Sequence, residues 1–170
     1  MPDQQKTEFS ASWGMPLKAM TGFFVVIFAF LVGVDFSRLG PPMPWARELL
    51  LGIPVLVGIV SAFYMVRGYS LQGTTLGIQR LGWVKTFNLT NLVSAQADPD
   101  ALRASVRVFG NGGLFSFCGW YRNKKLGMYR AYVTDARHAV VLRFSDKTVV
   151  VTPDESERFV NEVTSLLARR

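Results

Sequence analysis

The residues best suited to chemistry in this 170-residue chain are few, since Cys118 and His138 are its only thiol and imidazole. One cysteine cannot form an intramolecular disulfide, and a zinc site built from cysteine and histidine lacks ligands. A catalytic thiol at Cys118 would need His138 as its base, and the sequence does not bring them together. Asp135 or Asp146 could pair with His138 as acid and base, but both lie in tight turns, where aspartate normally serves the turn. The sequence therefore predicts no enzyme active site and no metal.

A glycine-rich segment, Gly110-Asn111-Gly112-Gly113, is a second place to look for chemistry, because such loops can cradle phosphates. Nucleotide-binding loops need a strand before the glycines and a helix after them, and phosphate loops also end in Gly-Lys-Ser or Gly-Lys-Thr. The sequence offers none of these features around the segment. We therefore expect a turn here, and no nucleotide or other cofactor.

The strongest candidate for ligand contact is an aromatic and basic segment at residues 98–126, which interrupts the predicted strands. Its candidate contact residues are Trp120, Tyr121, Arg122, Lys124 and Lys125. Aromatic rings beside cations can enter the lipid headgroup region while the cations hold phosphates. The alternative is that the aromatic rings cover an open barrel edge and the cations are solvated. Both interpretations stay open at this point.

Two apolar runs, at residues 19–34 and 49–66, precede this segment and must position it. The second run carries no charge and, as a helix, matches the hydrocarbon thickness of a bilayer. The first run reaches the same length when it is extended to Met15, with the Lys18 amine placed in the headgroups. We predict two transmembrane helices at about residues 15–34 and 49–66.

The segment between the two helices, residues 35–48, is predicted to turn the chain around, because it contains the helix-stopping residues Gly40, Pro41, Pro42 and Pro44. A cleaved signal peptide is one alternative for the first run, but no small-residue cleavage pattern follows it. Two core helices of a soluble protein are another, but neither run has a polar face. The predicted organisation is therefore an N-terminal tail at 1–14, a transmembrane hairpin at 15–66 and one domain at 67–170.

The distribution of basic residues predicts the orientation, because lysine and arginine near helix ends are retained in the cytoplasm. The turn has Arg38 and Arg47, whereas the other side has five basic residues: Lys6, Lys18, Arg67, Arg80 and Lys85. The formal charge of +7 belongs wholly to residues 67–170, because acidic and basic residues balance before them. We expect a multi-pass protein of the inner (cytoplasmic) membrane with both termini cytoplasmic. Anionic lipid explains the basic domain better than nucleic acid, since the charges are scattered.

Short segments rich in β-branched and apolar residues follow the hairpin and predict seven strands, at residues 69–72, 75–81, 84–89, 92–97, 128–134, 139–144 and 148–151. Thr152-Pro153-Asp154-Glu155 then has the pattern of a capping box, which predicts a helix that begins at Thr152. An apolar stripe on that helix consists of Phe159, Val160, Val163, Leu166 and Leu167. Seven strands and one C-terminal helix form the order of a pleckstrin-homology-like (PH-like) domain, a bent antiparallel sheet or barrel capped by its helix.

Three stretches of the sequence, residues 109–121, 126–135 and 151–154, also resemble the bacterial PH domain family of small membrane proteins. The resemblance covers roughly residues 69–165. It implies the PH-like fold and a non-enzymatic, membrane-associated role, and it transfers no catalytic residues.

The predicted function is therefore a membrane-anchored, non-catalytic PH-like binding module that docks a protein partner or anionic lipid at the cytoplasmic membrane face. The alternative is a structural subunit that assembles a membrane complex through its hairpin. In that case Gly22, Gly33, Gly52 and Ala62 would let its two helices, or those of another protein, approach closely.

Overall fold

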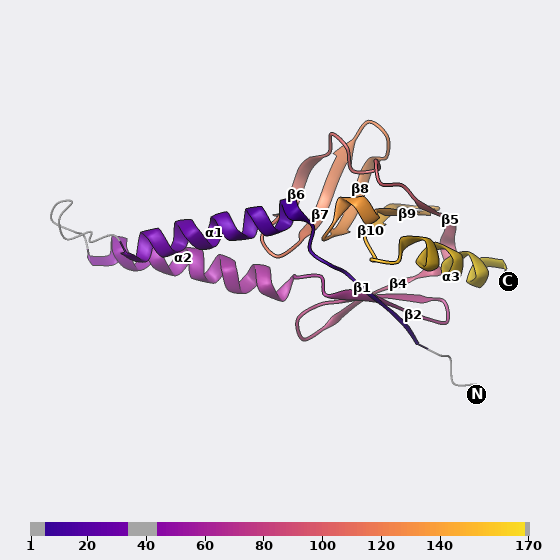
Figure 1. Ribbon diagram of the computed structural model, residues 1–170, viewed down its shortest axis with the longest axis horizontal. Helices are drawn as coiled ribbons and strands as arrows, with labels where there is room; N and C mark the ends of the chain where they lie inside the picture. Colours follow the sequence, from indigo (N-terminus) through magenta and orange to yellow (C-terminus); the bar gives the residue numbers. More distant parts are fainter. Residues whose placement is uncertain (1–5, 34–43, 169–170) are drawn as a thin grey trace.

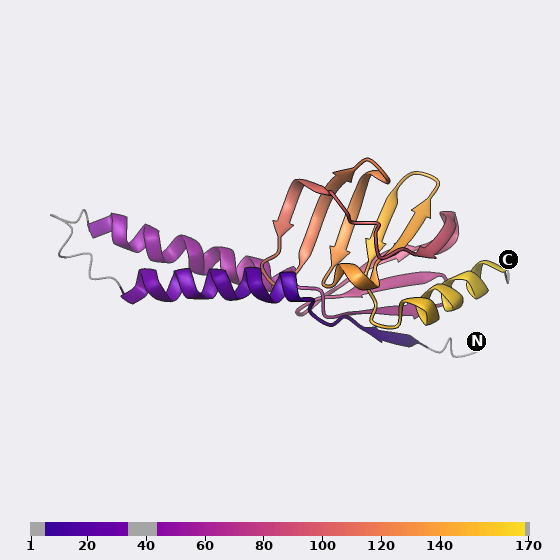
Figure 2. The same cartoon turned by 45° about the horizontal axis from the view of Figure 1, so that its top comes forward.

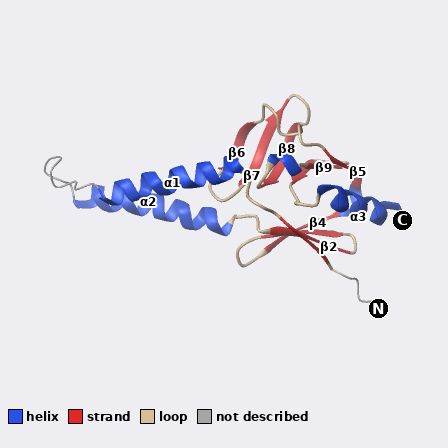
Figure 3. Ribbon diagram, viewed as in Figure 1, coloured by secondary structure: helices blue, strands red, loops and turns tan. Residues whose placement is uncertain are grey.

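The computed structural model describes residues 6–33 and 44–168. Two long helices lie side by side and extend from one end of a β domain (Figure 1). All strands of the described residues belong to that domain, and a third helix lies at its side (Figure 3). The molecule thus has the predicted order of a helical hairpin followed by a domain of strands and a C-terminal helix.

The first helix, α1 (Met15–Gly33), has 19 residues and matches its predicted range. The second, α2 (Pro44–Phe63), begins earlier than predicted, so the turn prediction is wrong for residues 44–48. Pro44 at the first helical position explains this start, because that position needs no backbone N–H. The rest of the predicted turn, including Gly40, Pro41 and Pro42, lies outside the described residues. α2 ends at Phe63, and Val66 is already buried in the domain core.

Length and composition make α1 the one helix of the described residues that could cross a membrane. At 1.5 Å per residue it is about 28 Å long. The apolar part of α2, Glu48–Phe63, is shorter than the usual span. The hypothesis that Gly22, Gly33 and Gly52 bring α1 and α2 close together is wrong for the described residues, since a methyl group added at any of these glycines would meet none of them within 4 Å.

The first sheet of the domain is four-stranded, in the order β1-β2-β3-β4, with all neighbours antiparallel. Its strands are β1 (Thr7–Ser10), β2 (Gly68–Gln72), β3 (Thr75–Gln79) and β4 (Val84–Asn88). β1 comes from the segment that was predicted as an N-terminal tail, and it pairs with β2 from Thr7 opposite Leu71 to Ser10 opposite Gly68. The domain therefore includes chain from both sides of the hairpin.

The second sheet is six-stranded, in the order β5-β9-β10-β8-β7-β6. Its strands are β5 (Leu92–Ala97), β6 (Val106–Gly112), β7 (Phe117–Asn123), β8 (Gly127–Val133), β9 (Val140–Phe144) and β10 (Thr148–Val151). The described residues thus form ten strands instead of the predicted seven, and β6 and β7 lie in the predicted interruption. The sheet is also not wholly antiparallel, because β10 runs parallel to β8.

Glycines explain why strand propensity did not predict β6 and β7. Gly110 lies opposite Gly119 in this strand pair, and both have a positive φ, of 121° and 143°. A methyl group at Gly110 would lie 2.3 Å from the Cys118 carbonyl oxygen, and one at Gly119 would lie 2.2 Å from that of Phe109. The glycines therefore permit a close backbone approach within a strand pair. The prediction of a turn at residues 110–113 is wrong for Gly110, Asn111 and Gly112, which end β6.

The core lies between the two sheets and α3 (Ser156–Ala168), which packs beside β5 (Figure 2). Phe159 is fully buried, and its ring contacts Phe9 edge-on at 5.1 Å between centroids. The predicted apolar stripe on this helix is confirmed, because Val163 is also buried and Val160, Leu166 and Leu167 pack against the same cluster.

Thr152 is not the cap of that helix, which begins at Ser156. Its side chain is fully buried instead, and its hydroxyl oxygen accepts a hydrogen bond from the Thr134 backbone N–H at 3.0 Å. The Thr152 backbone N–H donates to the Tyr69 hydroxyl, which itself donates to the Tyr132 carbonyl oxygen at 2.6 Å. Thr152 therefore joins the two sheets where a helix start was predicted.

Candidate functional site

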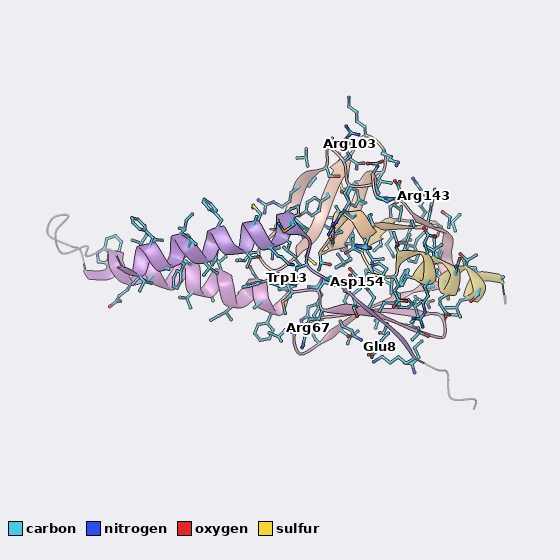
Figure 4. All side chains as sticks on the ribbon, viewed as in Figure 1. Glu8, Trp13, Arg67, Arg103, Arg143 and Asp154 are labelled. Carbon is cyan, nitrogen blue, oxygen red and sulfur yellow. The ribbon has the colours of Figure 1, made fainter. Side chains whose placement is uncertain are left out.

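Backbone and side-chain hydrogen bonds fasten the hairpin to the domain at the end where the chain enters α1. The Ser12 backbone N–H and hydroxyl donate to the two carboxylate oxygens of Asp154, at 2.8 and 2.7 Å. The Gly14 N–H donates to the Thr134 carbonyl oxygen at 3.1 Å. Figure 4 shows Trp13 and Asp154 at this junction of hairpin and domain. The start of α1 is thus held against the six-stranded sheet.

A second set of contacts holds the helices to the turn between β6 and β7. The Thr21 hydroxyl donates to the Gly113 carbonyl oxygen at 3.3 Å and accepts from the Phe115 N–H at 3.2 Å. The Ser116 hydroxyl donates to the carbonyl oxygen of Tyr64, just beyond α2. These contacts place the β6–β7 pair alongside the domain end of both helices.

A cavity of about 930 Å³ lies between the hairpin and the inner surface of the domain. Its apolar wall consists of Met20, Phe23, Phe24 and Ile27 from α1 and Val57 and Val60 from α2. Its other wall comes from the β6–β7 pair, from β8, and from the connection between β3 and β4. The cavity therefore exists only where hairpin and domain meet.

Arg80, which follows β3, occupies the inner part of this cavity. Its backbone N–H donates to the Trp83 carbonyl oxygen at 2.9 Å, which closes the tight connection to β4. Its guanidinium lies over three aromatic rings, at 4.7 Å from the Trp83 ring, 5.1 Å from Tyr64 and 5.3 Å from Tyr132. Such contacts stabilise a cation modestly. The connection thus fixes one arginine inside an aromatic cage.

The hydrogen-bond partners of Arg80 among the described residues include no carboxylate that would balance its positive charge. Nη1 donates to the Tyr64 carbonyl oxygen at 3.0 Å, and Nη2 lies 3.3 Å from the Cys118 sulfur. Arg80 is only 7% exposed, and its Nε is buried. Even so, Nε has no hydrogen-bond partner among the described residues. Burial raises the pKa of the Cys118 thiol, and the smaller effect of Arg80 opposes this. The thiol is therefore neutral near pH 7 and supplies no counter-charge.

Three further cations line the same cavity, and none of the described residues that line it is acidic. Arg130 stacks over the Trp120 ring at 4.6 Å, because the two residues are register partners on β8 and β7. Arg107 lies at the rim, where Nη1 donates to the Gly110 carbonyl oxygen, and Lys85 comes from β4. The five ion pairs among the described residues involve other cations: Lys6, Lys125, Arg137, Lys147 and Arg158. Several positive charges in a cleft with apolar walls attract anions strongly.

The five residues predicted for ligand contact are not gathered into one site. Trp120 lines the cavity, whereas Tyr121 points to the opposite face of β7, as strand alternation requires. There the Tyr121 ring stacks on Tyr129, and burial raises the pKa of its hydroxyl to about 12. The side chain of Arg122 is exposed on β7.

Lys124 and Lys125 lie in the turn between β7 and β8, at the opposite end of β7 from the turn that contacts α1. Lys125 forms an ion pair with Asp98 at 2.5 Å. Seven strand residues separate the two ends of β7, which amounts to roughly 20 Å. Lipid contact by Arg122, Lys124 and Lys125 stays a prediction, and these three residues are not among those that line the cavity.

Sequence reasoning missed the cavity cations because they come from four different strands or connections. Three patterns in the sequence point to the lining of the cavity. In β8 the alternation places Arg130 and Tyr132 on one face, and in β7 it places Cys118 and Trp120 on one face. The third pattern would be the apolar connection around Arg80, where a lone cation precedes Gly82 and Trp83.

The residues considered for catalysis have structural partners instead. Asp135 accepts hydrogen bonds from the Arg137 side chain and backbone N–H, and this arginine holds the pKa of the Asp135 carboxyl below its usual value. Asp146 forms an ion pair with Lys147. No group of three or more metal-ligating side chains occurs among the residues that the structure describes.

The comparisons with known proteins agree with the architecture. The family model described as bacterial PH domain matches residues 67–167. No curated protein matches the chain. The match covers the nine strands after the hairpin and most of α3, and it excludes β1, α1 and α2. With more than half of its length matched, the chain belongs to the bacterial PH domain family.

Proposed function

We propose that the protein is a membrane-anchored, non-catalytic binding module, in which the hairpin holds the PH-like domain at the cytoplasmic membrane face and the cavity between them binds an anionic ligand. The observation that carries this proposal is the cavity itself. Four cations line it, the described part of its lining contains no acidic side chain, and it lies directly beside the apolar helices.

The surface of the helices supports a membrane anchor. Large apolar side chains are exposed along both helices, including Phe23, Val26 and Phe30 on α1 and Ile53 and Leu56 on α2. Exposed apolar area of this extent in a soluble chain is unfavourable, and lipid would cover it. The length of α1, about 28 Å, is close to the hydrocarbon thickness of about 30 Å. Because α2 lies beside α1, both helices would enter the same bilayer.

The level of the cavity also fits this arrangement. Trp13, Tyr64 and Trp83 lie at the domain end of the helices, where an aromatic belt meets the headgroups of a bilayer. Lysine and arginine are more frequent on the domain side of the hairpin than on the turn side, which favours a cytoplasmic domain. The cationic end of the cavity would then lie at the level of the phosphates of the inner leaflet.

A second candidate function is a subunit that assembles a membrane complex through its hairpin. The observation in its favour is that no described residue lies within 4 Å of a methyl group added at Gly22, Gly33 or Gly52, which leaves room there for a helix of another protein. In this case the cavity residues would matter less than the outer surface of the hairpin.

Two measurements on the full-length chain test the first proposal. After alkaline carbonate extraction the chain should remain in the membrane pellet, and a C-terminal reporter should be active on the cytoplasmic side. In detergent, millimolar inorganic phosphate should raise the melting temperature of the wild-type chain more than that of Arg80→Met, because a ligand that binds only the folded state stabilises it. Release by carbonate, or equal stabilisation of both proteins, would contradict the proposal.

A further inference from the structure

We propose that the ligand of this cavity is one anionic phospholipid, with its phosphate at Arg80 and Arg130 and one acyl chain between α1, α2 and β6. This inference rests on the proposed function, because it names the ligand of that same cavity. It is carried by the size of the cavity, by the division between its cationic and apolar parts, and by the position of the unpartnered arginine.

Arg80 indicates what the polar end of the ligand must supply. A guanidinium buried without a carboxylate is costly, and its aromatic cage offsets only part of the cost. The Nε–H has no acceptor among the described residues, and the sulfur of a neutral thiol is a weak acceptor for Nη2. A phosphate group provides several strong acceptor oxygens and a compensating charge. Because the Arg80 side chain lines the cavity, the phosphate is expected beside its guanidinium, while Nε itself stays covered by protein atoms.

Arg130 provides the second cation at the same end. Its guanidinium is held over Trp120 at 4.6 Å, so its direction is fixed before a ligand binds. Tyr132 lies on the same face of β8, two residues further along, and its ring contacts Arg80. The two arginines therefore lie against neighbouring aromatic rings of the cavity, those of Trp120 and Tyr132, and Lys85 and Arg107 lie nearer its rim. A single phosphate between two preorganised guanidinium groups binds more tightly than it does between flexible lysines.

The remainder of the cavity is too large and too apolar for a free anion. Its volume of about 930 Å³ is at the upper end of the range of about 300–1,000 Å³ for small-molecule sites, far beyond the space that inorganic phosphate fills. The wall away from Arg80 consists of apolar side chains from α1 and α2. A nucleotide or an acidic peptide would leave that wall without an apolar partner, whereas a hydrocarbon chain would cover it.

The direction of the apolar wall favours a lipid that stays in the membrane. The lining residues of α1 extend from Met20 to Ile27, and Ile27 lies twelve residues beyond the start of the helix at Met15, or about 18 Å along its axis. Arg80 contacts Tyr64, at the domain end of α2. The polar end of the cavity is thus at the base of the hairpin, and the apolar end runs along the helices. A phospholipid in a bilayer has this same orientation.

The experiment measures the phospholipids that remain on the full-length chain after purification in a mild, non-ionic detergent. Extracted lipids are quantified by mass spectrometry per mole of protein, for the wild type and for Arg80→Met, Arg130→Met and the double variant. The control, Lys124→Met with Arg143→Met, removes the same charge from two exposed side chains that do not line the cavity. A further variant, Val60→Trp, fills the apolar part and leaves all cations in place.

The wild type and the control should each retain one anionic phospholipid. Each single arginine variant should retain about tenfold less, which corresponds to one lost charge-assisted contact, and the double variant should retain less than either. Val60→Trp should also lose the lipid, although its charge is unchanged. Equal retention by wild type and double variant would overturn the inference, as would equal retention of neutral phospholipid. If inorganic phosphate stabilises the chain through Arg80 while no lipid is retained, the lipid inference fails and the proposed function stands. If the chain leaves the membrane in carbonate, both fail.

Discussion

Arg80 makes it possible to separate binding from folding, because its guanidinium is buried without a carboxylate partner. Methionine is similarly long and unbranched, so Arg80→Met fills most of the same space without the charge. The substitution orphans no buried acceptor, since the Tyr64 carbonyl oxygen also accepts from the Ser116 hydroxyl at 3.2 Å. If Arg80 only holds the structure together, Arg80→Met should lower the free energy of unfolding. If Arg80 binds a ligand, the same substitution should leave that free energy nearly unchanged.

The magnitude follows from the contacts of Arg80. A hydrogen bond from a charged donor contributes about 1.5–3 kcal/mol. The three ring contacts, at 4.7, 5.1 and 5.3 Å, contribute about 0.5–1 kcal/mol each at sites open to solvent. Against these gains, an uncompensated buried charge costs several kcal/mol. The two sides nearly cancel, and we expect the free energy of unfolding to change by less than about 1 kcal/mol.

Urea titration of the full-length chain in detergent, followed by circular dichroism, measures this change. Phe159→Ala provides the comparison for a residue that only holds the core. If Arg80→Met lowered the free energy of unfolding as much as Phe159→Ala does, Arg80 would be a structural residue. The argument that its charge is kept for a ligand would then be refuted.

Four further substitutions test the fold. Phe159→Ala should lower the free energy of unfolding by about 3–5 kcal/mol, since its fully buried ring packs on Phe9 and Tyr69. Thr152→Val should cost about 1–3 kcal/mol in the same urea titration, because it removes the acceptor of the Thr134 N–H, and Thr152→Ser should cost less. Gly119→Ala should cost about 2 kcal/mol or more, and more than Gly82→Ala, where an added methyl group meets nothing within 4 Å. Asp135 contributes stability that is present above its usual pKa and is lost as pH falls through its lowered pKa, so Asp135→Asn should show a smaller fall in melting temperature between pH 5 and pH 2.

The parts of the fold that followed from the sequence are those with a local pattern. The apolar stripe from Phe159 to Leu167 predicted a helix that packs on the core, and that contact is present. Seven strands of the β domain lie close to their predicted ranges, and β5 and β10 match them residue for residue. Periodicity carries this information because each strand or helix buries one face.

The parts that were missed depend on contacts between distant segments. Thr7–Ser10 has no strong strand pattern, and it becomes a strand because β2 offers a free edge. In the sequence, glycines such as Gly110 and Gly119 indicate a turn. In the sheet, this pair of glycines permits two strand backbones to approach closely. The cavity was missed for the same reason, since Arg80, Arg107 and Arg130 are adjacent only after the sheets and the hairpin assemble.

The same contacts show why the domain alone is the wrong object for binding measurements. A fragment from residue 67 onward contains the family match, but it lacks β1 and both helices. Without β1, the edge of β2 is unpaired and Phe159 loses the ring of Phe9. Without α1 and α2, Arg80 loses the Tyr64 carbonyl oxygen and ring, and the apolar wall of the cavity is absent. Such a fragment would bind vesicles only through its surface charges, which salt screens over about 8 Å. Anionic lipid that the full-length chain retains in detergent at high salt, and that the double variant of Arg80 and Arg130 loses, would therefore come from the cavity that hairpin and domain build together.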